Sequence, residues 1–271
     1  MAARNEQSDR SDVTSGHNVE AMSRPAPLVI FPYEPLPPDM VTGVKGILSY
    51  SFVGTFNAEF LTQSATEFIS SNADADIAAL AKVIRKFLDF SEEDFNFESS
   101  VYNRGSTPIP CWLCVRMWLP TDELTAPHWH RDGRGFPCAC HGPNIPHSKY
   151  AISLSGPSTR VLRASAYLDD VVDSIDRKYR LNRSYLAEKL QGCDEILVEK
   201  GQIIRFSYGQ DDSPVHSGPE CKDGDRVFAS VLFGSETEIR SVCKRRGIQY
   251  GAARIQSLKD RGARRASQKT I

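Results

Sequence analysis

The chain has no excess of either charge and no long apolar run. Lys and Arg number 33 against 34 Asp and Glu, for a net charge of −1 over 271 residues. This balance gives no general attraction to nucleic acid or to an anionic membrane. The longest apolar stretches, such as residues 227–233, are far shorter than the roughly 20 residues that a membrane helix needs. We therefore predict a protein that does not span a membrane.

Secretion signals are missing as well. Residues 1–24 are polar and contain no apolar segment of the kind that a secretory signal requires. The seven cysteines are odd in number and scattered, which is not typical of a disulfide framework. These features predict an intracellular protein with reduced thiols, in the cytoplasm or alternatively in the nucleus.

Composition divides the chain into three parts. Residues 1–24 are too polar to offset the entropy of ordering, so we predict a disordered N-terminal arm. Residues 25–239 are predicted to form a single domain. Residues 240–271 carry ten Lys or Arg against one acid, Asp260, and are predicted to form a basic C-terminal tail. This tail is interpreted as a solvated segment, or alternatively as a binding segment for nucleic acid or another anionic partner.

Hydrophobic periodicity predicts helices first and strands afterwards. Apolar residues recur at three and four positions within 57–71 and 74–90, as on one face of a helix. Short runs rich in β-branched and aromatic residues then predict strands, and a helical insertion is predicted at 169–190. This order indicates an α+β fold whose sheets form a jelly roll or cupin-like barrel. The predicted strands are 111–119, 149–154, 159–163, 195–198, 202–208 and 226–233.

Histidine is scarce and clustered. Four of the six histidines fall between residues 128 and 147. On an extended segment, residues i and i+2 face the same side, so His130 and Asp132 can point at one cation. His216, between two predicted strands, supplies a third ligand. Two imidazoles and one carboxylate with open positions suit a non-heme Fe(II) site.

The order His130-Arg131-Asp132, then His216, then Arg226 resembles the signature of the Fe(II)/2-oxoglutarate-dependent dioxygenases. The resemblance covers residues 111–234 and implies a double-stranded β-helix fold. It implies that His130, Asp132 and His216 bind iron and that Arg226 holds the far carboxylate of 2-oxoglutarate. Residues 155–159 are similar to a turn that adds a hydroxyl to this co-substrate site in one branch of the family, which makes Thr159 a second candidate.

The resemblance also implies the cofactors and the chemistry. Fe(II) and 2-oxoglutarate would react with molecular oxygen to give succinate, CO₂ and an oxidised substrate. Because Asp132 is present, the resemblance implies hydroxylation, demethylation or desaturation and not halogenation. A small-molecule substrate is the first expectation, and a nucleic-acid or protein substrate is the second. Neither the substrate nor the oligomeric state follows from the residues.

Other interpretations of the same residues stay open. Cys138, Cys140, His141 and His147 offer ligands of the kind that hold zinc, although Cys-X-Cys-His is not the usual ribbon spacing. A cupin-like site of three histidines could use His128, His130 and His216. Either variant would fit a β-barrel binding module. An Arg that opens a strand, such as Arg226, is also a common salt-bridge partner, and Thr159 a common turn residue.

Overall fold

A computed structural model describes residues 26–32, 34–100, 109–120, 126–133, 148–174, 183–219 and 224–257. The expected N-terminal arm and the cysteine-containing loop, with Cys138, Cys140, His141 and His147, lie outside these ranges. The elements in chain order are β1 (Leu28–Ile30), β2 (Val41–Thr42), β3 (Leu48–Thr55), α1 (Ala58–Asn72), β4 (Asp74–Ala75), α2 (Ile77–Ser100), β5 (Pro110–Trp118), β6 (Ser148–Ser155), β7 (Arg160–Leu162), α3 (Ala166–Ser174), α5 (Arg183–Lys189), β8 (Glu195–Ile196), β9 (Ile204–Ser207), β10 (His216–Ser217), β11 (Arg226–Phe233), α6 (Glu236–Arg246) and β12 (Ala252–Ser257).

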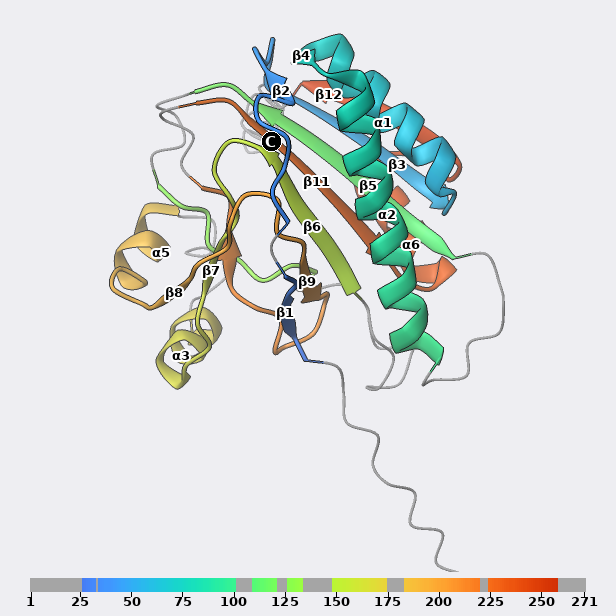
Figure 1. Cartoon of the computed structure of the whole chain (residues 1–271). Coiled ribbons are helices and arrows are strands. Elements are labelled where there is room, and N and C mark those ends of the chain that lie inside the picture. The colour runs from blue at the N-terminus through green and yellow to red at the C-terminus, as the bar shows by residue number, and fades with distance from the viewer. Residues whose placement is uncertain are drawn as a thin grey trace, which may run out of the picture.

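A seven-stranded sheet forms the body of the molecule (Figure 1). Its strand order is β1-β9-β6-β11-β5-β3-β12, and a second, three-stranded sheet has the order β10-β7-β8. Neighbouring strands in both sheets pair antiparallel. The prediction of a mixed helix and sheet fold is confirmed, and the large sheet is antiparallel.

Residue alternation along β5 assigns the two faces of the large sheet. Cys111, Leu113, Val115 and Met117 belong to the main core cluster together with residues of α1 and α2 such as Leu61 and Leu80. The two helices therefore cover this face, as Figure 1 shows. The intervening residues of β5 point to the opposite face, because successive strand residues alternate.

The opposite face is covered by α6 and by the smaller sheet. Trp112 and Cys114 of β5 pack with Ile239 and Val242 of α6. The outer side of the small sheet carries α3 and α5, whose Leu168 and Leu186 share a cluster with Leu162 of β7 and Val215. The candidate ligands lie at the junction between the two sheets.

Part of the expected C-terminal tail belongs to this folded body. Residues 240–246 complete α6, and β12 pairs along its full length with β3. Local signals explain the helix: Ser235 and Glu238 form a capping box at its start, and Gly247 closes it in the left-handed conformation at φ 62°. The positive charges of this segment therefore include residues that are positioned by secondary structure.

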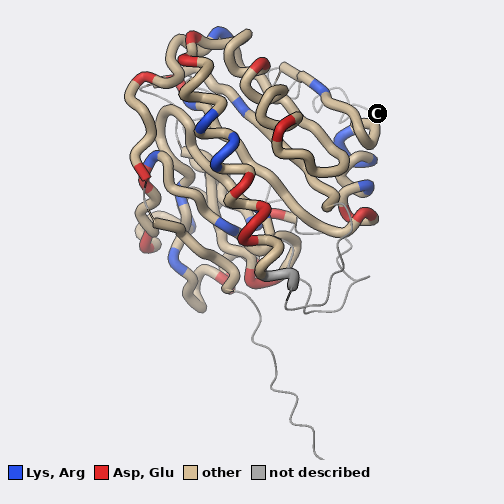
Figure 2. The backbone as a smooth tube through the Cα atoms, turned by 45° about the vertical axis from the view of Figure 1, so that its right-hand side comes forward, with Lys and Arg blue, Asp and Glu red and all other residues tan. Residues whose placement is uncertain are grey.

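Charged residues are spread over the fold, and helix α2 separates them along its length. Positive residues occupy its first half and negative residues its second half (Figure 2). In the second half, Asp94 accepts hydrogen bonds from Tyr150 of β6 at 2.7 Å and from Arg205 of β9 at 2.9 Å. This contact fixes α2 to two strands of the large sheet. Within the part of the chain that the structure describes, no helix has the length and apolar character needed to cross a membrane.

Candidate metal centre

Backbone pairing brings two distant histidines together. His130 and His216 form an antiparallel bridge in which each backbone amide donates to the other residue's carbonyl at 3.0 Å. His216 begins β10, which pairs in turn with β7. The two imidazole rings have a centroid distance of 4.5 Å. Residues separated by 86 positions are thus neighbours because they occupy opposite positions of one ladder.

Asp132 completes the group. One ligand atom from each of His130, Asp132 and His216 lies within 4.8 Å of the others. Nε2 of His130 is 3.5 Å from Oδ1 of Asp132, and Nε2 of His216 is 3.4 Å from Oδ2 of the same carboxylate. The sequence prediction that these three side chains meet is matched by the geometry.

The second nitrogen of each ring has a backbone partner. Nδ1 of His130 lies 2.6 Å from the carbonyl oxygen of His128, and Nδ1 of His216 lies 3.1 Å from that of Pro214. A carbonyl only accepts, so each Nδ1 carries the proton and each Nε2 presents a lone pair toward Asp132. Fixing the tautomer in this way is the usual support for a metal-binding histidine. Two Nε2 atoms and one carboxylate are the donor set that suits Fe(II).

Two neighbouring contacts hold the segment that carries His130 and Asp132. Arg131, between them, points to the other side and forms ion pairs with Asp169 and Asp173 of α3. Gly133 has φ +72°, and a Cβ added to it would lie 2.6 Å from the backbone nitrogen of Gly209. That nitrogen donates a hydrogen bond to the carbonyl of Asp132 at 3.0 Å. The turn therefore needs glycine, and its tight contact fixes the backbone of Asp132.

Electrostatics keep the ligands in their binding forms. Burial alone would raise the pKa of Asp132, but the positive charge of the contacting Lys149, with smaller contributions from the two neighbouring histidines, holds it well below its usual range. Burial lowers the pKa of His216 and outweighs the opposing effect of Asp132. Near neutral pH the site thus has an ionised carboxylate and a neutral buried imidazole, the forms that bind metals.

Lys149 is part of this site and was not found from the sequence. Its Nζ lies 2.5 Å from Oδ2 of Asp132, and its side chain is 11% exposed. A cation therefore sits beside the carboxylate at the place where the donor set converges, as a metal ion would. The strand predicted at 149–154 indicates only that Lys149 lies in phase with Ala151 and Ser153, on the face of the sheet opposite to α1 and α2.

Arg226 and Thr159 also meet. Nη2 of Arg226 donates to Oγ1 of Thr159 at 3.1 Å, and Nε donates to the carbonyl of Pro157 at 2.9 Å. The guanidinium lies 5.2 Å and 4.8 Å from the ring centroids of Trp118 and Phe228. Arg226 is 3% exposed and Thr159 is 6% exposed. A buried guanidinium oriented in this way is suited to binding a carboxylate.

Strand register relates this pair to the histidines. Val161 of β7 lies opposite His216, and Thr159 is two residues before Val161. Two strand residues correspond to roughly 7 Å of backbone. Thr159, just before β7, therefore lies near His216, and it links the histidines to Arg226 at the start of β11.

The three-histidine alternative is not what the structure assembles. His128 is exposed and stacks on the ring of His130 with a centroid distance of 4.9 Å. Among the described residues, the group with metal-ligand spacing contains Asp132 and not His128.

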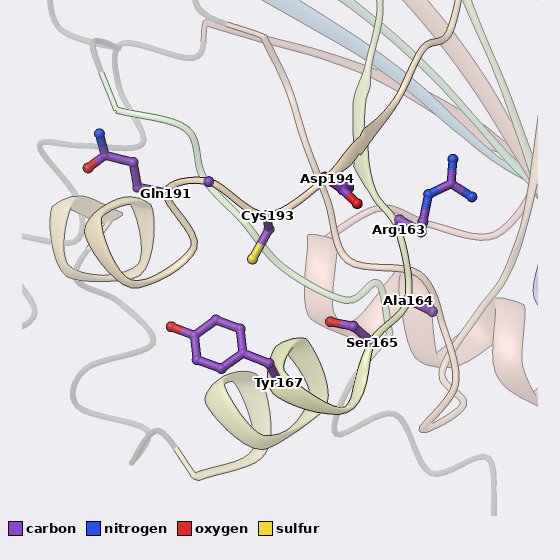
Figure 3. A pocket seen from close by; sticks show the side chains of 8 residues that line it. Arg163, Ala164, Ser165, Tyr167, Gln191, Cys193 and Asp194 are labelled. Atoms are coloured by element: carbon purple, nitrogen blue, oxygen red, sulfur yellow. The ribbon is translucent and has the colours of Figure 1, made fainter.

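A pocket on the outside of the small sheet does not include the candidate ligands. Figure 3 shows it between α3 and the turn that follows α5. The hydroxyl of Tyr167 donates to the carbonyl of Lys189 at 2.8 Å and joins these elements. None of its lining residues is a residue of the candidate site; they are Arg163, Ala164, Ser165, Tyr167, Gln191, Gly192, Cys193 and Asp194.

Comparisons with known proteins identify no sequence relative. No family model matches the chain. No curated protein matches it either.

Several solved structures are similar at low identity. EvdMO1 is 20% identical, with 56% of this chain and 33% of EvdMO1 covered and a TM-score of 0.32. HygX from Streptomyces hygroscopicus with nickel and 2-oxoglutarate bound is 10% identical, with 69% and 83% covered and a TM-score of 0.36. A prolyl-4-hydroxylase from Pseudomonas putida is 12% identical, with 69% and 85% covered and a TM-score of 0.34. This chain spans a third of the length of EvdMO1. At these scores the similarity assigns no activity to this chain.

Proposed function

We propose that this protein is an Fe(II)- and 2-oxoglutarate-dependent oxygenase that oxidises a small molecule. The convergence of Nε2 of His130, Nε2 of His216 and the carboxylate of Asp132, all within 4.8 Å, is the observation that carries the proposal. We further propose that the two sheets form a double-stranded β-helix, with the metal at the junction where His130 pairs with His216.

Each candidate residue has a distinct task. His130 and His216 bind the metal through Nε2, while their Nδ1–H groups donate to backbone carbonyls and keep the rings in place. Asp132 supplies the single negative charge of the ligand set. Phe206 stacks on the ring of His216 at 11° and 4.5 Å and covers one side of it.

Arg226 is proposed to hold the far carboxylate of 2-oxoglutarate. Its hydrogen bond with Thr159 directs the guanidinium, and the two aromatic rings beside it exclude water, which strengthens a charge-assisted hydrogen bond. The short separation between Thr159 and the strand position opposite His216 fits a small diacid that reaches from the metal to Arg226.

The bound metal and co-substrate supply the oxidising chemistry. Together they would use molecular oxygen to give succinate, CO₂ and an oxidised substrate. The protein's part is to position these reactants and to protect them from water. Lys149 neutralises Asp132 in the metal-free protein and competes with a metal for this carboxylate.

Succinate formation tests this proposal. Purified protein with Fe(II), 2-oxoglutarate and oxygen should form succinate slowly without any added substrate. Asp132→Asn should abolish it, and Arg226→Gln should raise the 2-oxoglutarate concentration for half-maximal rate at least tenfold, because a charge-assisted contact is worth roughly 1.5 to 3 kcal/mol. Arg85→Gln, which changes an exposed arginine of α2, is the matched control. Equal succinate formation by the wild type and Asp132→Asn would contradict the proposal.

A further inference from the structure

Three positive side chains lie on the face of the large sheet that α6 and the small sheet cover, which we call the inner face. They are beside the candidate metal centre. We call Arg116 of β5, Lys149 of β6 and Arg246 of α6 the cationic cluster. The guanidinium of Arg246 lies 4.7 Å from the ring centroid of Trp112. Arg116 and Arg246 each interact electrostatically with Asp132, and Lys149 contacts it directly. The cluster is thus continuous with the proposed oxygenase site.

The cluster lacks matching negative charge. Across the described ranges, no carboxylate lies within ion-pair distance of Arg116 or Arg246, and Nε of Arg116 is buried without a hydrogen-bond partner. Burial and the charge of Arg116 lower the pKa of Arg246. Burial alone would raise the pKa of Cys114, yet the charges of Arg116, Arg246 and Lys149 lower it. When Asp132 binds a metal ion, the ion neutralises the negative charge of this carboxylate. That charge then no longer compensates the positive charges of the cluster.

A cavity of about 10 Å³, room for one water-sized group, lies beside Arg246 and is lined mainly by polar side chains. Strand register places Ser49 of β3 opposite both Arg116 and Gln256 of β12, so these side chains share the inner face. Hydroxyl, amide and guanidinium donors on buried strands are the groups that bind an oxyanion. The residues that line the pocket are Ser49, Ser51, Arg246, Ile248, Arg254 and Gln256.

This place is distinct from the proposed co-substrate site. Arg226 packs over Trp118 and Arg246 over Trp112, at opposite ends of β5. The two tryptophans are six positions apart on β5, which corresponds to roughly 20 Å. Arg116 lies between them, opposite Phe228 of β11, so Arg246 is the member of the pair that separates this place from Arg226. A ligand on Arg246 would therefore occupy a place other than the one proposed for the co-substrate.

We propose that Arg116 and Arg246 bind an oxyanion group of the substrate, so that the oxidised molecule is a small acid carrying a carboxylate, sulfate or phosphate group. This inference rests on the proposed oxygenase function and adds the chemical class of its substrate. The bidentate geometry of the guanidinium, held over Trp112, gives such a group a fixed orientation relative to the metal.

Calorimetric titration with sulfate tests the site itself, in the metal-free protein at constant ionic strength. We expect one sulfate per chain, with a Kd at least tenfold weaker in Arg246→Gln and in Arg116→Gln. Arg246→Lys keeps the charge but loses the planar fork, so it should give an intermediate Kd and also serves if Arg246→Gln does not fold. Arg85→Gln should bind as the wild type does. Acetate, tested in parallel, reports a planar carboxylate in the same site.

Sulfate binding needs neither iron nor 2-oxoglutarate, so its result is independent of the succinate measurement. The inference is overturned if neither sulfate nor acetate binds, or if binding is unchanged in Arg246→Gln and Arg116→Gln. It is also overturned if Arg226→Gln alone removes binding, or if 2-oxoglutarate with Mn(II) displaces the sulfate, since the cluster would then hold the co-substrate. Retention of sulfate in the presence of both supports a separate substrate site.

Discussion

At the scale of single residues, the carboxylate of Asp132 has two competing cationic partners, Lys149 and a bound metal. The ion pair is buried, with the two side chains 11% and 16% exposed and 2.5 Å between Nζ and Oδ2. Ion pairs of this kind are costly to break from one side because the remaining charge stays desolvated. Lys149 therefore stabilises the metal-free protein and opposes metal binding.

The variant Lys149→Met separates these two effects. We expect the free energy of unfolding of the metal-free protein to fall by about 3 kcal/mol. Metal affinity should rise, because the ion no longer displaces a cation from Asp132. Denaturant unfolding with and without Mn(II) measures both, and the metal-induced stabilisation should be larger in the variant than in the wild type. Weaker metal binding in Lys149→Met would show instead that the lysine supports the bound state.

The ligand residues could be predicted from the sequence, but their electrostatic partner could not. His130 and Asp132 are two positions apart on an extended segment, His216 lies between two predicted strands, and the family resemblance added Arg226 and Thr159. Lys149 is visible only as a charged residue at the start of an apolar strand. Its contact with Asp132 depends on how the strand lies against the turn at Gly133, which no local pattern specifies.

At the scale of secondary structure, helix α2 is fixed to the large sheet by one buried polar contact. Asp94 joins Tyr150 and Arg205, whose side chains come from adjacent strands. The adjacent residues of the same two strands, Lys149 and Phe206, point to the opposite face and contact the candidate ligands there. The position of α2 is therefore connected to that of the site.

Asp94→Ala should lower the free energy of unfolding by about 3 kcal/mol, because it removes the carboxylate from a buried guanidinium. Asp89→Ala is the matched control on the same helix. Asp89 pairs with Arg85 where both side chains are about half exposed, and such i,i+4 pairs contribute about 0.3 to 0.5 kcal/mol. Denaturant unfolding compares the two variants, and equal losses would contradict a special role of the buried contact.

Most elements with a strong hydrophobic periodicity could be predicted from the sequence. Strands that form only because they pair with a strand distant in sequence could not. Helices at 57–71 and 74–90 and the strand at 226–233 match α1, α2 and β11 closely, because their apolar faces are continuous. Strands β3 and β12 were missed. β12 has a single large apolar residue, Ile255, within the expected basic tail, and it is a strand because β3 offers it an edge.

At the scale of the whole molecule, two site residues make stability depend on pH in the same direction. His216 and Asp132 both have a folded-state pKa below the ordinary value. The unfolded chain therefore binds more protons than the folded protein, and stability must fall as the pH is lowered. The His216 contribution is present above its unfolded pKa of about 6.5, and that of Asp132 above about 3.9.

We expect the metal-free protein to lose up to about 1.4 kcal/mol per pH unit from His216 as the pH falls below about 6.5. Urea unfolding at several pH values between 7.5 and 5 measures this dependence. In His216→Asn the slope over this interval should be smaller, because the variant has no imidazole to protonate on unfolding. A wild-type stability that rises as the pH is lowered across this interval would contradict the assignment.

Metal stoichiometry tests the central claim most directly. Under anaerobic conditions, equilibrium dialysis against Fe(II) should give one ion per chain for the wild type and none for Asp132→Asn or His216→Asn. The double substitution Cys138→Ser and Cys140→Ser, in the loop interpreted alternatively as a zinc site, should still bind one ion. Metal that is retained in Asp132→Asn and lost in the cysteine variant would contradict a centre built from His130, Asp132 and His216.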